Sequence, residues 1–200
     1  MHMNNQKLML PAGKAVYPHL NTPDRQFDEL GTYQSRISIP VEEARGVMET
    51  ISAMYQSHTG KKINPSDNTC WKLEEDDNGD RTGNVLFKVK AKNRRTRDGA
   101  VWDRAPRLVD ASLKPTKARV GGGSLIKVGC ELFAWDAAGQ KGLSLQPRIV
   151  QIIQLVEDGG VTESFDDFGM TAEQGFAATD ASEPEAEVEE YTEVEDHDDF

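Results

Sequence analysis

Apolar and polar positions alternate along two stretches of the chain that predict half-buried β-strands. In residues 32–39, Ile37 and Ile39 share one face and Arg36 lies on the other, until Pro40 interrupts the pattern. In residues 84–93, apolar residues alternate with lysines in the same way. Because every second side chain of a strand lies on the same face, the lysines are expected to form one positive row.

Two further strands are predicted between residues 125 and 156. Residues 125–135 have an unbroken apolar face, and residues 143–156 return after a turn that contains Gly139. A shorter strand is expected at 107–112. Proline and glycine punctuate residues 8–31, which predicts a loop around one short apolar piece at 15–17, for which a strand is the alternative. Residues 61–83 are predicted as a polar loop.

Residues 41–58 change to helical spacing, with Ala44, Val47 and Ile51 on one stripe and Gly60 placed to end the helix. Methionines and a tyrosine on that stripe could form a partner-binding groove. Packing of the helix on a sheet is the favoured interpretation. Five or six strands with one helix after an early strand favour a mainly β protein, a five-stranded Greek-key barrel of the OB-fold kind.

Charge divides the chain into two parts. The 200 residues carry 34 Asp plus Glu and 23 Lys plus Arg, a net charge of −11. Residues 157–200 hold seventeen of the acids and no Lys or Arg, so residues 1–156 have a net charge of +6, and 84–120 alone reach +8. We therefore predict a folded basic domain at 1–156 and a disordered acidic tail at 157–200, because such a tail cannot bury enough apolar surface to fold.

Templates for catalysis and metal binding fit poorly. The acidic run 76–80 lacks the glycine and the final carboxylate of a calcium loop, and the four histidines and two cysteines never reach the spacing of zinc ligands. We expect no enzyme, no cofactor and no metal. Cys70 and Cys130 are expected to be reduced thiols. No apolar run reaches the length of a membrane span and no signal peptide is visible, so no membrane association is expected.

The remaining candidate is a nucleic-acid surface, since proteins that bind single strands combine cations for phosphates with aromatic rings for base stacking. For each aromatic residue the alternative is an ordinary core position, and for the lysine row it is a solvated face. The candidate residues are Tyr33, Arg36, Lys88, Lys90, Lys92, Arg94, Arg95, Arg97, Trp102, Lys127, Phe133 and Trp135.

The stretch Gly121 to Val128 (GGGSLIKV) resembles the start of a strand in the single-stranded-DNA-binding proteins of T-odd podoviruses and related phages. Residues 133–135, the return strand 145–152 and an acidic tail ending in Phe200 are similar in order and spacing. The resemblance covers about residues 105–156 and the tail. It implies an OB-fold with a helix and sequence-independent binding of single-stranded DNA in replication and recombination.

The resemblance also implies roles for the tail. It would occupy the DNA site of the free protein and contact phage replication proteins through residues such as Asp196, Asp198, Asp199 and Phe200. A homodimer or a cooperative assembly on DNA stays open. The expected location is the cytoplasm of the infected bacterial host. Two alternatives remain: an acidic DNA mimic that targets a host nucleic-acid-binding protein, and a nuclease that uses clustered carboxylates with magnesium.

Overall fold

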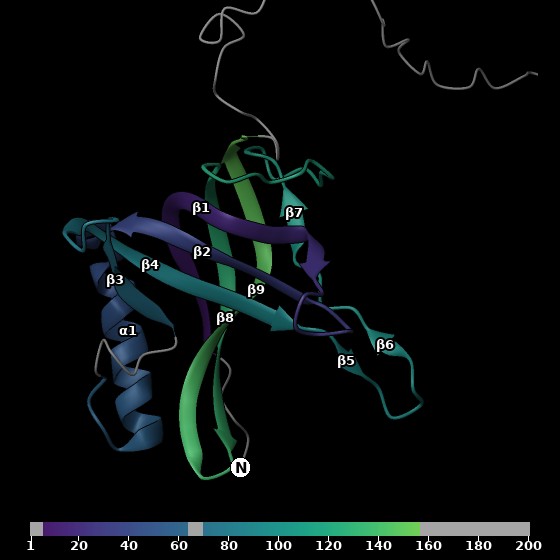
Figure 1. Cartoon of the computed structure of the whole chain (residues 1–200), viewed down its shortest axis with the longest axis horizontal. Coiled ribbons are helices and arrows are strands. Elements are labelled where there is room, and N and C mark those ends of the chain that lie inside the picture. Colours follow the sequence, from purple (N-terminus) through teal and green to yellow (C-terminus); the bar gives the residue numbers. More distant parts are fainter. Residues whose placement is uncertain (1–5, 64–69, 157–200) are drawn as a thin grey trace, which may run out of the picture. The chain divides into compact units, whose positions relative to one another are not determined.

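The computed structural model describes residues 6–63 and 70–156. This part of the chain forms one helix and nine strands, and Figure 1 shows how they are arranged. In chain order they are β1 (Gln6–Asp24), β2 (Thr32–Pro40), α1 (Val41–Thr59), β3 (Trp71–Glu75), β4 (Arg81–Lys92), β5 (Arg94–Arg95), β6 (Val101–Trp102), β7 (Arg107–Val109), β8 (Leu125–Ala137) and β9 (Gln140–Gln154).

Five of the strands close into a barrel. The main sheet has the order β3-β4-β2-β1-β8-β9-β7, and a parallel pairing of Val89 in β4 with Leu145 in β9 joins its two halves. The closed ring is therefore β1-β2-β4-β9-β8, with β3 and β7 added outside it. This strand order is that of an OB-fold, and the predicted fold is confirmed.

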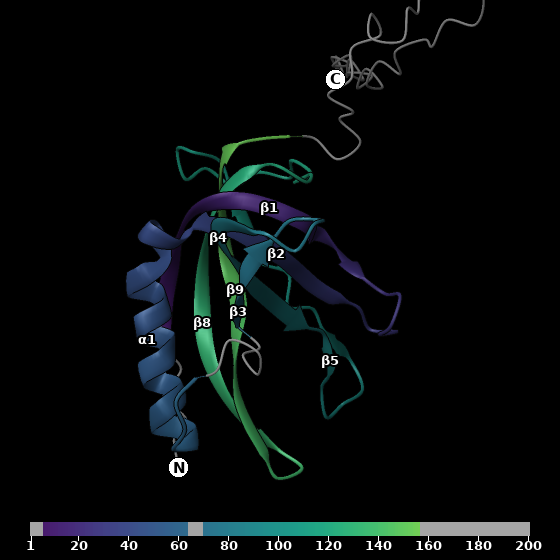
Figure 2. The same cartoon turned by 60° about the vertical axis from the view of Figure 1, so that its left-hand side comes forward.

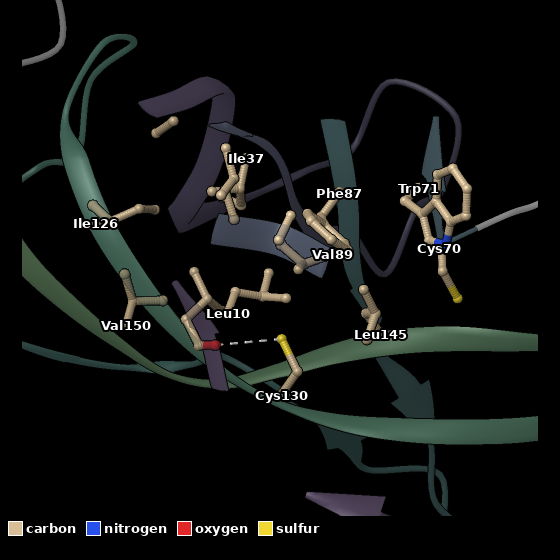
Figure 3. Close-up of a cluster of buried hydrophobic side chains, with 14 of the residues drawn as sticks. Leu10, Ile37, Cys70, Trp71, Phe87, Val89, Ile126, Cys130, Leu145 and Val150 are labelled. Atoms are coloured by element: carbon tan, nitrogen blue, oxygen red, sulfur yellow. Dashed lines mark hydrogen bonds between the residues drawn. The ribbon is translucent and has the colours of Figure 1, made fainter. Parts of the chain in front are cut away.

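The barrel interior is filled by the apolar faces that alternation predicts. Phe87 and Val89 of β4 meet Ile37 of β2, and Ile126 of β8 lies across from them with side chains of β9 (Figure 3). All four are fully buried. Burying apolar surface at roughly 25 cal/mol per Å² is the main stabilising term for such a core. The sequence pattern therefore fixes which face of each of these strands is left outside.

The helix α1 lies along one side of the barrel (Figures 1 and 2) and contacts β1, β2, β4, β8 and β9. Its C-cap is Gly60, with φ of 74° and an N–H that donates to the Gln56 carbonyl at 2.8 Å. Met48, Met54 and Tyr55 pack against the core at partly buried positions. The interpretation of α1 as a helix packed on a sheet is confirmed.

The prediction of a loop over residues 8–31 is wrong for most of its length, because β1 runs through three prolines. Each proline lies inside an irregularity of strand pairing: Pro11 between Leu10 and Gly13, and Pro18 between Val16 and His19. Pro23 lies in the last irregularity, before Asp24. A bulge removes the need for a ladder N–H, so proline is tolerated there.

The interpretation of residues 61–83 as a polar loop is also wrong in part. β3 forms at Trp71–Glu75 and pairs with β4, which begins at Arg81 rather than at residue 84. The strand expected at 107–112 is shorter, and residues 94–102 form an unpredicted hairpin of β5 and β6. Within the described residues, no helix is long and apolar enough to cross a membrane.

Gly13 provides a test of the barrel packing. A Cβ at this position would lie 2.5 Å from Ile39 Cγ1 and 2.6 Å from the Ser38 carbonyl oxygen. Gly13→Ala is therefore expected to lower the free energy of unfolding by about 1–3 kcal/mol. Gly46→Ala is the matched control, since its Cβ would meet nothing within 4 Å and alanine favours a helix by up to about 1 kcal/mol. Urea denaturation measures both; equal stability of the two variants would contradict this packing.

Candidate nucleic-acid interface

Cross-strand pairing brings the exposed cations of β2 and β4 together. Arg36 lies opposite Lys88, and the next positions place Gln34 opposite Lys90. Residues opposite each other in an antiparallel pair share a face, with Cβ atoms about 5 Å apart. Arg36, Lys88 and Lys90 are all exposed, and we call these three residues the cationic face. The predicted positive row is thus real, and β2 adds an arginine to it.

Lys88 is the most crowded member of the cationic face. Partial burial lowers the pKa of its ammonium group, and the neighbouring charges of Lys90 and Arg36 lower it further. Like charges held this close raise one another's electrostatic free energy. A bound phosphate would relieve that repulsion and release its counterions, so this geometry favours a polyanion.

Lys92 differs from the other two lysines of the row. Its Nζ lies 3.3 Å from Asp28 Oδ2, in the loop between β1 and β2. Burial alone would raise the pKa of Asp28, but the hydrogen bond and charge of Lys92, with hydrogen bonds from Thr32 and the Leu30 backbone, lower it. Lys92 is therefore already paired with a carboxylate, and it anchors this loop.

Tyr33 is not an exposed stacking platform, and that prediction is wrong. Only 4% of the residue is exposed. Burial raises the pKa of its hydroxyl to about 12, with a further contribution from a hydrogen bond to Asp103. The strand alternation already indicated this result, since it placed Tyr33 on the same face as Ile37.

Tyr17 is the aromatic residue beside the cationic face that the sequence analysis missed. It stands in the β1 bulge before Pro18 and is 77% exposed. Together with His19, Arg36 and Lys88 it lines a hollow of about 140 Å³. A Tyr-Pro pair within an apolar run could have indicated a bulge, because proline disrupts the ladder there.

The β5–β6 hairpin carries a second group of cations next to the end of β4 (Figure 1). Arg94 pairs with Trp102 and Arg95 with Val101, so Arg94 and Trp102 share one face of the hairpin. All three predicted arginines of this segment, Arg97 included, are exposed. Trp102 is 49% exposed, which leaves much of its ring accessible.

Arg104 packs against one face of the Trp102 ring. Its guanidinium lies 5.2 Å from the centre of the Trp102 ring, a cation–π contact. Arg104 is only 7% exposed and donates a hydrogen bond from Nη2 to Gln146 Oε1. Burial lowers the pKa of Arg104, and Arg148 and Arg94 lower it further. A buried cation among other cations adds to the positive potential next to the hairpin.

Asn93 connects the hairpin to the loop between β1 and β2. Its Nδ2 donates to the Leu30 carbonyl at 2.9 Å, and its Oδ1 accepts from the Arg104 backbone N–H at 2.9 Å. Its own backbone N–H donates to the Gly31 carbonyl at 3.1 Å. The cations of β4 and those of the hairpin are therefore held in a fixed relation.

The structure does not bring the β8 candidates onto the cationic face. Lys127, Phe133 and Trp135 are half-buried on β8, which is separated from β2 by β1 and from β4 by β9. The Trp135 ring covers Gly142, where a Cβ would lie 2.3 Å from Cζ2. Contact of these three residues with DNA stays a prediction. The tail residues Asp196, Asp198, Asp199 and Phe200 lie outside the described part of the chain.

Groups of three or more His, Cys, Asp or Glu that could hold a metal ion do not occur among residues 6–63 and 70–156. Cys70 and Cys130 are both buried. Burial raises the pKa of the Cys130 thiol, which lies 3.8 Å from the Val128 carbonyl oxygen (Figure 3). Both cysteines belong to the core rather than to the cationic face.

Comparison with solved structures finds the same fold in phage proteins. The chain superposes on the crystal structure of gp2.5, a single-stranded DNA binding protein encoded by bacteriophage T7, with a TM-score of 0.60 and 20% identity, covering 88% of this chain and 100% of that one. The single-stranded DNA-binding protein from bacteriophage Enc34, in complex with ssDNA, gives 0.58 and 15%, covering 77% and 89%. The sequence matches no protein-family model and no curated protein. At these identities the likeness establishes the fold.

Proposed function

We propose that the chain binds single-stranded DNA without sequence preference during phage DNA replication and recombination. The observation that carries the proposal is the cationic face, where strand pairing brings the exposed side chains of Arg36, Lys88 and Lys90 together. The shared fold with the Enc34 protein, whose structure holds ssDNA, supports the same conclusion.

The chemistry of this surface explains why no base would be preferred. Lys and Arg contact phosphates, which are identical at every nucleotide. Exposed rings such as Tyr17 and Trp102 can stack on any base, at about 1–3 kcal/mol for each contact. Stacking requires accessible bases, so the aromatic contacts favour an unpaired strand over a duplex.

The acidic tail acts in the same proposal as a tethered competitor. Its seventeen carboxylates and lack of Lys or Arg make it complementary to a basic domain. DNA would displace the tail and release Asp196, Asp198, Asp199 and Phe200 to bind phage replication proteins. The chain would bind DNA in the cytoplasm of the infected bacterium. Self-association of the chain on DNA is compatible with this proposal.

A competition experiment tests the proposed function. A labelled oligo-dT bound to the full chain is challenged with unlabelled oligo-dT, with a mixed-sequence strand and with the corresponding duplex. We expect the two single strands to compete within a few-fold of each other and the duplex to compete much more weakly. Equal competition by the duplex would contradict selectivity for single strands, and no binding at all would turn attention to the tail as a DNA mimic.

Trp102 is expected to act as a stacking platform. Trp102→Ala should weaken oligo-dT binding by about 1–3 kcal/mol, or roughly 5- to 150-fold, because one base–aromatic contact is lost. Trp102→Phe should retain most of the affinity. Anisotropy of a labelled oligo-dT measures both variants, since neither retains the Trp102 fluorophore. Full affinity in the alanine variant would exclude Trp102 from the interface.

A further inference from the structure

A second and larger hollow shares Tyr17 with the small hollow beside the cationic face. Its volume is about 950 Å³, and its lining includes Lys14, Arg25 and Arg119. Val16, Tyr17 and His19 line both this hollow and the small one beside Lys88. Tyr17 thus stands at the boundary of two basic depressions, of which only the small one belongs to the proposed site so far.

The backbone of Tyr17 is held in an uncommon conformation. Its φ is 48°, in the left-handed region, where a residue with a side chain costs of order 1–3 kcal/mol. The bulge between the pairs Val16–Arg36 and His19–Gln34 imposes this geometry. The ring that this backbone presents is 77% exposed, so it is accessible to a ligand.

The wall of the large hollow opposite β1 is fixed in place. Asn21 donates from Nδ2 to the Ala118 carbonyl at 2.7 Å and accepts from the Val120 N–H at 3.0 Å. On the adjoining turn, the Gly123 N–H donates to the Ala15 carbonyl at 2.8 Å. These bonds connect residues about a hundred positions apart in sequence, so the hollow is formed before any ligand arrives.

The carboxylates that line the large hollow already accept hydrogen bonds. Glu74 accepts from Ser38 at 2.8 Å and from Asn84 at 2.9 Å. Burial alone would raise the pKa of Glu74, but these bonds, one from Thr82 and the nearby charge of Lys14 lower it. Asp24 accepts from the Gln26 N–H at 2.9 Å and from the Gln34 side chain at 2.8 Å. Among the described residues, no ion pair engages Lys14 or Arg25. Lys14 acts on Glu74 through its charge, but within residues 6–63 and 70–156 neither cation is held in an ion pair that a phosphate would first have to break.

We propose that a DNA strand bound on the cationic face continues over β1 at Tyr17 into the large hollow. There, Lys14 and Arg25 hold its phosphates, and the Tyr17 ring stacks on the base at the crossing. The inference rests on the proposed function and deepens it, since it assigns a second segment of the binding track. A strand too long to fit on the cationic face alone should therefore bind more tightly than a shorter one, because it also reaches the large hollow.

The test uses the full chain and a length series of labelled oligo-dT from about four to about twenty nucleotides. Lys14→Gln combined with Arg25→Gln should bind the shortest strands as wild type does and bind the longest about tenfold more weakly. The salt slope for long strands should fall by about 1.4, since each phosphate contact contributes about 0.7. Tyr17→Leu should weaken binding of the strands long enough to cross β1.

Lys61→Gln combined with Lys62→Gln is the matched control, because it removes the same charge from exposed positions beyond α1. The inference would be overturned if the Lys14 and Arg25 variant bound long strands as tightly as the control does. It would also be overturned if that variant lost the same affinity at every strand length. Either result would leave the proposed function intact. Failure of wild type to bind any strand would overturn both.

Discussion

Replacing Arg36, Lys88 and Lys90 together with glutamine is expected to weaken oligo-dT binding by on the order of a hundredfold at low salt. A hydrogen bond to a charged partner contributes about 1.5–3 kcal/mol when desolvated, and these exposed groups would contribute less. The three residues lie on neighbouring strands with exposed side chains, so their removal should leave the core unchanged. The slope of log affinity against log salt should fall by about 2, at about 0.7 for each phosphate.

The matched control for this variant is Lys7→Gln with Lys61→Gln and Lys62→Gln, three exposed cations outside the cationic face. It removes the same net charge, so it measures the non-local electrostatic effect. Equal loss in both variants would mean that overall charge, and not the cationic face, attracts DNA. Thermal denaturation of both proteins checks that the fold is retained.

Removal of residues 157–200 is expected to tighten DNA binding by roughly tenfold at low salt. A tethered segment has an effective concentration of about 1 mM, so a tail that binds its own domain with a Kd of about 0.1 mM would weaken DNA binding about tenfold. The gain should shrink as salt rises, because screening weakens the attraction of the tail for the domain. Among the described residues, every strand and the helix lie before residue 157. Titration of oligo-dT at two salt concentrations measures the effect.

Phe200→Ala separates the two roles of the tail. It removes the terminal ring and keeps all seventeen carboxylates, so its DNA affinity should stay close to that of the full chain. A truncated protein that binds DNA no more tightly than the full chain would contradict competition by the tail. A large gain in affinity from Phe200→Ala alone would show that the ring, and not the charge, holds the tail in place.

Alternation predicted the strands whose two faces differ in polarity. In β4, lysines alternate with Val89 and its apolar neighbours, and the structure keeps that division without exception from Phe87 to Lys92. The helix was equally clear because its apolar spacing and Gly60 agree. Such local signals are enough to predict a strand or helix when one of its faces is buried and the other is exposed to solvent.

Features that depend on distant partners could not be predicted locally. β1 was hidden by its prolines, since only the pairing with β2 and β8 reveals that each one falls in a bulge. Tyr17 was missed for the same reason, because a bulge decides which way its side chain points. The role of Lys92 depends on Asp28, which lies in another loop.

The aromatic candidates also separate into residues whose exposure follows from local alternation and residues whose exposure depends on distant parts of the chain. Tyr33 shares a face with Ile37 and is buried, as alternation indicates. Trp102 has no alternating neighbours, and its exposure follows from the hairpin and from Arg104 packed against it. Phe133 and Trp135 do lie on the face of β8 that alternation assigns, but barrel closure sets that face apart from β2 and β4. Which outward faces become neighbours is a property of the topology.

The most direct test of the central claim is the salt dependence of oligo-dT binding by the full chain, measured by fluorescence anisotropy. We expect binding at low salt and a linear fall of log affinity with log salt. The slope should be about −2 or steeper, because at least the three cations of the cationic face contact phosphates. Absence of binding at low salt, or an affinity that does not change with salt, would contradict the central claim.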